Sequence, residues 1–221
     1  MGSFIVFEGG EGAGKSTQAR TLSRRLSREG YQVVLTHEPG GTPLGETVRR
    51  WLKTRRGLTP TTELMLFTAA RAQLVETIIS PALESGRIVI CDRFIASTVT
   101  YQGCGRGLDL ELINRLNKAT THNLFPDLTV FLDVEVETGL ARKKGRPGGQ
   151  TAERDTFESE TLEFHRRVRE GYLALASSEP PACSGREGWL VIDGTLPRDT
   201  IASRIWEKVR QILDDRPADA R

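Results

Sequence analysis

Residues 9–16, with the sequence GGEGAGKS, have the residue types and the spacing that bind a polyphosphate. They match the pattern G-x-x-x-x-G-K-[S/T] and lie between an apolar run and a stretch with helical periodicity. Glycines let backbone N–H groups approach phosphate oxygens, while Lys15 would reach the β- and γ-phosphates and the Ser16 hydroxyl would ligate Mg²⁺. The pattern therefore predicts a nucleoside triphosphate site. We expect it to consist of Gly9, Gly10, Glu11, Gly12, Ala13, Gly14, Lys15, Ser16 and Thr17.

Polar residues also follow two further apolar runs that are typical of strands. Glu38 and Pro39 come shortly after the first run, and Asp92 and Arg93 come at the end of the second. Ligands of open α/β sheets bind at the carboxyl ends of the strands, so we expect these residues to border a bound substrate. Asp92 could hold a magnesium-bound water, and Arg93 could clamp a phosphate group. Hydroxyl and amide groups that could read a base or a sugar follow in Ser97, Tyr101 and Gln102.

The elements that must position these residues follow from hydrophobic periodicity. Short apolar runs rich in β-branched residues predict strands at residues 4–8, 32–36, 87–92, 128–134 and 189–193. Helical periodicity predicts helices at residues 15–29, 43–53, 61–83, 110–121, 157–175 and 199–213. This alternation predicts an α/β fold with a parallel sheet covered by helices on both faces. We expect a single domain over residues 1–213 and a frayed tail over residues 214–221.

The composition is ordinary for a soluble globular protein. Of the 221 residues, 38% are hydrophobic and 27% are charged, and the formal net charge is +2 at pH 7. This charge gives no signature of a nucleic-acid or membrane partner. The three cysteines lack metal-binding spacing, and no apolar run has the length of a signal-peptide core or a membrane span. We therefore expect a soluble, cytoplasmic protein with neither nucleic acid nor membrane as a partner.

Five further motifs extend the pattern along almost the whole chain. They read EPGGT from residue 38, LMLFTAAR from 64, DRF from 92, STVTYQG from 97 and PDLTVFLDV from 126. In the order and spacing of these motifs, together with the phosphate loop, the chain resembles the thymidylate kinases, and in particular the bacterial type. The resemblance implies a P-loop NTPase three-layer fold with a five-stranded parallel sheet, and a homodimer. It also implies phosphoryl transfer from MgATP to dTMP, giving ADP and dTDP for dTTP synthesis.

The resemblance assigns the acceptor nucleotide to named side chains. Phe67 would stack on thymine, and Arg71 would donate to a thymine carbonyl group. This assignment is physically reasonable because an aromatic face binds any base, and a guanidinium one helical turn away lies on the same face of the helix. Arg49 and Arg93 would clamp the monophosphate.

The resemblance also gives roles to the residues around the sugar and the base edge. Glu11 would accept a hydrogen bond from the 3′-hydroxyl group of the acceptor. Ser97 and Gln102 would help to read the base. Tyr101 would pack near the deoxyribose, where the 2′-hydroxyl group of a ribose would clash.

Residues 141–156 are Gly-rich and basic, which is typical of a mobile lid. Bacterial-type relatives commonly end this lid in D-R-x-E, whereas this chain reads DTFE, with Thr156 in place of the arginine. We therefore expect other lid arginines to act in its place. The groups expected to neutralise charge on the transferring phosphoryl group are Lys15, Arg93, Arg146 and Arg154.

Two other classes of protein stay open at this point. One is a kinase for another nucleoside monophosphate or small acceptor, and the other is a non-catalytic nucleotide-dependent switch. A GTPase would need the pattern N-K-x-D; Asn117 and Lys118 begin it, but no acid follows, and we interpret them as surface residues of a helix. Arg142 is expected to contact adenine, but ATP as the donor is implied by the resemblance alone.

Overall fold

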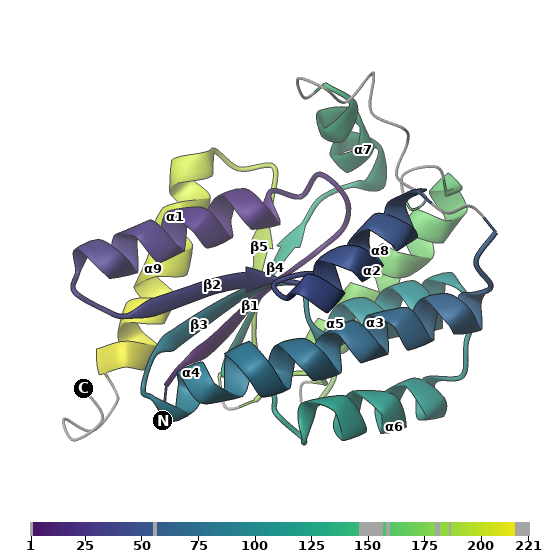
Figure 1. Cartoon of the computed structure of the whole chain (residues 1–221). Helices are drawn as coiled ribbons and strands as arrows, with labels where there is room; N and C mark the ends of the chain where they lie inside the picture. The colour runs from purple at the N-terminus through teal and green to yellow at the C-terminus, as the bar shows by residue number, and fades with distance from the viewer. Residues whose placement is uncertain are drawn as a thin grey trace.

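A five-stranded parallel sheet lies at the centre of the fold (Figure 1). The computed structural model describes residues 2–54, 57–145, 157, 160–179, 182–185 and 187–214. The sheet has the order β2-β3-β1-β4-β5 and confirms the predicted strands and α/β class. The strands are β1 (Phe4–Glu8), β2 (Val33–His37), β3 (Ile88–Asp92), β4 (Leu128–Asp133) and β5 (Trp189–Asp193).

Helices cover both faces of this sheet (Figure 1). One face packs against α1 (Lys15–Arg28) and α9 (Arg198–Asp214). The other face is covered by α3 (Pro60–Leu74), the π-helix η1 (Val75–Ile79), α4 (Ser80–Glu84) and α8 (Leu162–Ser177). Outside this layer, α2 (Pro43–Thr54) and α6 (Leu110–Thr121) pack against α3. The result is a three-layer arrangement in which the sheet is the middle layer.

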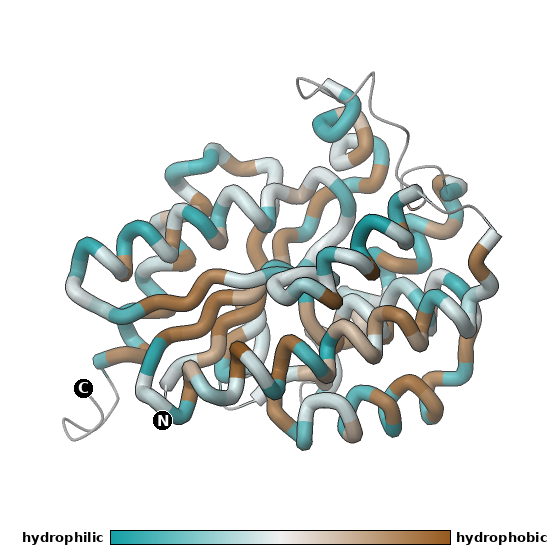
Figure 2. Tube along the Cα trace, in the orientation of Figure 1, coloured by the Kyte–Doolittle hydropathy of each residue, from teal (hydrophilic) through white to brown (hydrophobic). Residues whose placement is uncertain are grey.

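Hydropathy follows the same layers (Figure 2). The strands are largely hydrophobic, whereas hydrophilic and hydrophobic residues alternate along the helices. β1 is buried along its whole length, as expected for the central strand of a doubly covered sheet. Among the described residues, we find no helix with the length and apolar character that a membrane crossing requires.

The register of the strands brings three loops to one edge of the sheet. Phe7 of β1 pairs with Asp92 of β3, and His37 of β2 pairs with the same residue. The loops that follow β1, β2 and β3 therefore begin side by side. This is the edge at which the sequence predicts ligand binding.

Two predicted helices have different boundaries in the structure. The helix expected at residues 61–83 is a helical run made of α3, η1 and α4, with a π-turn in its middle. The helix expected from residue 157 begins instead at Leu162, because the Thr161 side chain accepts a hydrogen bond from the Phe164 N–H and caps the helix there.

Other helical segments were not predicted. One is α7 (Val136–Lys144), in which only Val136 and Gly139 are buried, so it has no apolar stripe that periodicity could detect. The others are α5 (Ile95–Thr98) and the π-helix η2 (Val99–Gly105), which follow β3. The first residues of the predicted lid thus belong to α7. Residues 146–156, which include Arg146 and Arg154, lie outside the described residues. The same is true of residues 215–221 of the expected tail.

Candidate active site

The loop between β1 and α1 has a conformation that depends on glycine. Gly12 has a φ of +70°, and a Cβ atom at this position would lie 1.9 Å from the carbonyl oxygen of Gly139 in α7. A Cβ atom on Gly139 would in turn lie 2.3 Å from the carbonyl oxygen of Glu11. α7 therefore lies directly against the phosphate loop, and neither glycine can carry a side chain without moving the two segments apart.

Lys15 is the first residue of α1 and points back into this loop. Its Nζ atom donates to the carbonyl oxygens of Gly9, at 2.9 Å, and Gly10, at 2.7 Å. Burial and the nearby Arg93 guanidinium lower the pKa of Lys15 to about 8. An anion bound in the loop would add negative charge beside Lys15 and favour its charged form.

Ser16 and Asp92 form an oxygen-rich pair beside the loop. The Ser16 hydroxyl donates to Asp92 Oδ2. Asp92 Oδ1 is buried and has no hydrogen-bond partner among the residues that the structure describes. A hydroxyl group and an unpaired carboxylate oxygen fit a hard cation such as Mg²⁺, which needs few protein ligands because it keeps several waters. The described part of the chain holds no group of three or more His, Cys, Asp and Glu suited to another metal.

Glu11 lies between two cations. Its Oε1 atom accepts from Arg93 Nη2 at 2.8 Å, and its Oε2 atom accepts from Lys143 Nζ at 2.6 Å. Burial opposes ionisation, but the charges of Arg93 and Lys143 hold the pKa of Glu11 well below its usual range. The Tyr101 hydroxyl donates to the same carboxylate at 3.1 Å and accepts from Arg93 Nη2 at 3.0 Å.

Arg93 has an unusual backbone conformation for a residue with a side chain, with a φ of +75°. Its guanidinium is largely buried, with 17% of the side chain exposed. Although burial disfavours the charge, the oxygens of Tyr101 and Glu11 raise the pKa of Arg93 well above its usual range. A permanently charged guanidinium is therefore held at the edge of the phosphate loop.

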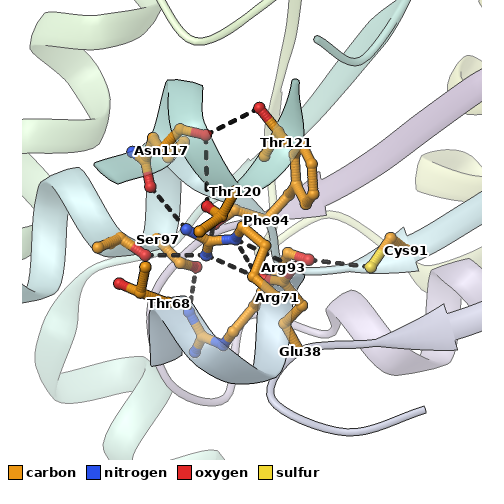
Figure 3. A network of polar contacts seen from close by, with 12 residues as sticks. Glu38, Thr68, Arg71, Cys91, Arg93, Phe94, Ser97, Asn117, Thr120 and Thr121 are labelled. Atoms are coloured by element: carbon orange, nitrogen blue, oxygen red, sulfur yellow. Dashed lines mark hydrogen bonds and ion pairs between the residues drawn. The ribbon is translucent and has the colours of Figure 1, made fainter. Parts of the chain in front are cut away.

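Arg71 is a buried cation of the site, with 1% exposure. Figure 3 draws its side chain within a network of polar contacts. Its Nε and Nη2 atoms donate to Glu38 at 2.6–3.1 Å, and Nη2 also donates to Thr98 Oγ1 at 2.8 Å and the Phe94 carbonyl oxygen at 3.1 Å. Nη1 donates to Asn117 Oδ1 at 2.7 Å and carries a second N–H that could donate to a ligand. Burial raises the pKa of Glu38, although Arg71 opposes this shift.

Asn117 corrects one prediction from the sequence. The sequence favours a surface position for it in the middle of a helix, yet only 6% of it is exposed. The interpretation was wrong because α6 turns this side chain toward α3, where the buried Arg71 needs an acceptor.

A single cavity of about 590 Å³ brings most of the predicted site residues together. This volume is within the usual range for small-molecule sites. The predicted residues that line it are Glu11, Gly12, Ala13, Gly14, Lys15, Ser16, Glu38, Pro39, Arg49, Phe67, Arg71, Asp92, Arg93, Ser97, Tyr101 and Gln102.

The remaining predicted residues lie around this cavity or outside the described chain. Gly9 and Gly10 adjoin it through their contacts with Lys15, and Thr17 follows on α1. Arg142 donates to the Gly194 carbonyl oxygen at 2.8 Å, just beyond the end of β5.

Two of the predicted base-reading residues have internal partners. Ser97 Oγ donates to Glu8 Oε2 at 2.7 Å, and Gln102 Nε2 donates to Glu63 Oε1 at 2.8 Å. Both side chains line the cavity, but these donor groups are bonded to neighbouring carboxylates. The Phe67 ring lies 6.0 Å from the Phe157 ring, and both rings line the cavity.

Sequence reasoning missed several further residues that line the cavity, among them Thr98, Lys143 and Phe157. Thr98 follows the predicted Ser97 directly. Lys143 lies one helical turn after Gly139, so the i, i+4 spacing would have placed both on one face of α7 if that helix had been predicted. Phe157 carried no signal beyond its position at the end of the lid.

Comparison with known proteins gives one consistent family. The family model described as "Thymidylate kinase" matches residues 7–205. The thymidylate kinase of Thermomicrobium roseum is 49% identical over 213 residues, which cover 96% of this chain and 97% of the relative. That of Synechococcus sp. (strain JA-3-3Ab) is also 49% identical, over 95% of this chain and 96% of the relative. The crystal structure of thymidylate kinase from Ehrlichia chaffeensis is 36% identical, with a TM-score of 0.73 over 95% of this chain and 99% of that chain.

Proposed function

The chain belongs to the thymidylate kinase family, and from this premise we propose that it transfers the γ-phosphoryl group of MgATP to dTMP, giving ADP and dTDP for dTTP synthesis. One observation carries the proposal. The cavity joins a phosphate loop that ends in Lys15 to a second part lined by Phe67 and Arg71, which suit a base. Two nucleotides can therefore meet in it, with their phosphates near Arg93.

The acceptor dTMP occupies the part of the cavity between α3 and the loop after β3. Thymine stacks on Phe67, and the second N–H of Arg71 Nη1 donates to a base carbonyl group. Arg49 and Arg93 bind the monophosphate. The Tyr101 ring packs against the deoxyribose and leaves no room for a 2′-hydroxyl group.

The donor nucleotide binds at the phosphate loop. Backbone N–H groups of residues 9–16 and the N-terminus of α1 bind its phosphates, and Lys15 Nζ exchanges the loop carbonyl oxygens for phosphate oxygens. Ser16 and Asp92 would hold Mg²⁺, directly or through water, and a bound Mg²⁺ would neutralise charge on the phosphate oxygens. Arg142, beside Gly194, lies toward the adenine end.

The chain accelerates transfer chiefly by positioning and by neutralising charge, because phosphoryl transfer has a loose transition state that needs no strong base. Glu11 changes partners when dTMP binds. The monophosphate competes with Glu11 for Arg93, and the 3′-hydroxyl group of dTMP donates to the carboxylate that Arg93 releases. Arg146 and Arg154 of the lid bring further positive charge, and lid closure excludes water that would otherwise hydrolyse ATP.

We also propose that the protein is a cytoplasmic homodimer. Large apolar side chains on α2 and α3 support an interface on that side, where Leu44, Trp51 and Met65 are each more than two-fifths exposed. Analytical ultracentrifugation tests the dimer, and a monomer at micromolar concentration contradicts it.

A coupled assay of ADP release tests the activity. The purified chain is given MgATP with dTMP, dUMP, UMP, CMP, AMP or GMP in turn. We expect dTMP to be the preferred acceptor. Preference for another monophosphate would instead favour a different nucleoside monophosphate kinase, and ATP binding without acceptor-dependent ADP release would favour a nucleotide-dependent switch.

A further inference from the structure

Glu8, the last residue of β1, is a buried carboxylate that the function described above does not use. Its exposed fraction is 0%. Its Oε1 atom accepts from the backbone N–H groups of Phe94, at 2.9 Å, and Ser97, at 3.2 Å. Its Oε2 atom accepts from the hydroxyl groups of Ser97 and Tyr172, both at 2.7 Å. The carboxylate thus joins β1, the turn after β3, and α8.

The Oε1 side of Glu8 fixes the backbone around Arg93. The Phe94 and Ser97 N–H groups belong to the start of α5, immediately after Arg93. The Arg93 N–H donates to the Phe7 carbonyl oxygen at 2.9 Å. β1 therefore binds the turn through its backbone at Phe7 and through the side chain of Glu8. A non-glycine residue at a φ of +75° is strained and persists only where the surroundings hold it.

The Oε2 side of Glu8 orients the hydroxyl groups that face the Arg93 side chain. A carboxylate only accepts hydrogen bonds, so the hydrogens of the Ser97 and Tyr172 hydroxyl groups point toward Glu8. The oxygen lone pairs then face Arg93 Nη1, which lies 3.2 Å from Ser97 Oγ and 3.4 Å from the Tyr172 oxygen. A guanidinium only donates, and both hydroxyl groups are thereby set to accept from it.

We propose that Glu8 is a positioning residue for Arg93, which it acts on through the turn after β3 and through the Ser97 and Tyr172 hydroxyl groups. Glu8 keeps the guanidinium directed at the phosphate of the acceptor nucleotide. The inference rests on the proposed role of Arg93 as the clamp on the monophosphate.

Glu8→Gln tests the inference with little change in shape. Its amide oxygen can still accept from the two backbone N–H groups, but its NH₂ group donates to the two hydroxyl groups. Their hydrogens then turn toward Arg93, a donor that cannot accept them. We expect the Kd for dTMP to rise about tenfold, while the Kd for thymidine, which lacks the phosphate, changes by less than about twofold.

Tyr172→Phe is the second variant, because it removes one of the two hydroxyl groups and keeps the ring. We expect it to raise the Kd for dTMP about threefold and to leave thymidine binding unchanged. It carries the test alone if the Glu8 variant does not fold. Glu84→Gln, at an exposed acid of α4, makes the same charge change outside the network and is expected to alter neither Kd.

Calorimetric titration of each variant with dTMP and with thymidine distinguishes the outcomes. Equal weakening of both ligands would mean that Glu8 only maintains the fold, and unchanged dTMP binding would overturn the inference as well. Arg93→Ala is measured in parallel. If Arg93→Ala weakens the binding of dTMP no more than that of thymidine, the proposed role of Arg93 itself fails. If Arg93→Ala selectively weakens the binding of dTMP but Glu8→Gln does not, only the role of Glu8 fails.

Discussion

Replacing Glu38 with glutamine is expected to destabilise the fold and weaken the base site together. The side chains of Arg71 and Glu38 are 1% and 4% exposed, and their closest N–O distance is 2.6 Å. Glutamine keeps one acceptor but places an NH₂ group against a guanidinium, which only donates. Arg71 would then be a buried cation that has lost its counter-charge.

The size of the effect follows from the contacts that remain. Breaking a buried ion pair by changing one partner costs about 3–5 kcal/mol. Three other oxygen atoms still accept hydrogen bonds from Arg71, so we expect the lower end of this range. For a chain of this size, a loss of about 3 kcal/mol lowers the Tm by about 6–12 °C. The Kd for dTMP should rise in parallel, because Arg71 loses its fixed orientation.

Urea unfolding of the wild type, Glu38→Gln, Arg71→Met and the double variant provides the measurement. We expect the double variant to lose about 2 kcal/mol less than the sum of the two single losses, because it leaves no unpaired buried charge. Glu46→Gln is the matched control, since Glu46 pairs with His37 at 3.1 Å in an exposed position and should cost less than about 1 kcal/mol. Strict additivity, or a Glu38 effect no larger than that of the control, would refute the reasoning.

Three further predictions concern the two nucleotides and the lid. Phe67→Leu should raise the Kd for dTMP by about 5- to 150-fold, because stacking on a base contributes about 1–3 kcal/mol; unchanged binding in a titration would exclude stacking. Since the pKa of Lys15 is about 8, its charge is present below that pH and lost above it, so kcat/KM for ATP should fall as the pH rises through 8. A Lys15→Arg variant, which stays charged, should lack this fall, and an identical profile would assign it to another group. Arg146→Ala and Arg154→Ala should each lower turnover by about two to three orders of magnitude with modest change in dTMP affinity; unchanged turnover in both and in the double variant would contradict the lid mechanism.

The parts of the fold with strong local signals could be predicted from the sequence. The five strands are short apolar runs between turns, and the phosphate loop has a motif whose spacing is set by its backbone. Phe67 and Arg71 lie four residues apart on α3, and both line the cavity as the helical spacing implies.

The rest depended on contacts between distant segments. α7 contacts the phosphate loop through Gly139, and only Val136 and Gly139 of this helix are buried. Its sequence therefore has no apolar stripe from which a helix could be predicted. Asn117 has a polar side chain in a helix, and only the buried Arg71 from α3 explains why it is inside. Glu8 was seen only as the end of a strand, because the groups that donate to it come from residues 94, 97 and 172.

Transfer of label from [γ-³²P]ATP tests the central claim most directly. The chain is incubated with Mg²⁺, labelled ATP and either dTMP or no acceptor, and the nucleotides are separated by chromatography. The account predicts that the label appears in dTDP, in step with ADP, and that little inorganic phosphate forms without dTMP. Label that appears only as inorganic phosphate, or at a rate independent of dTMP, would contradict it.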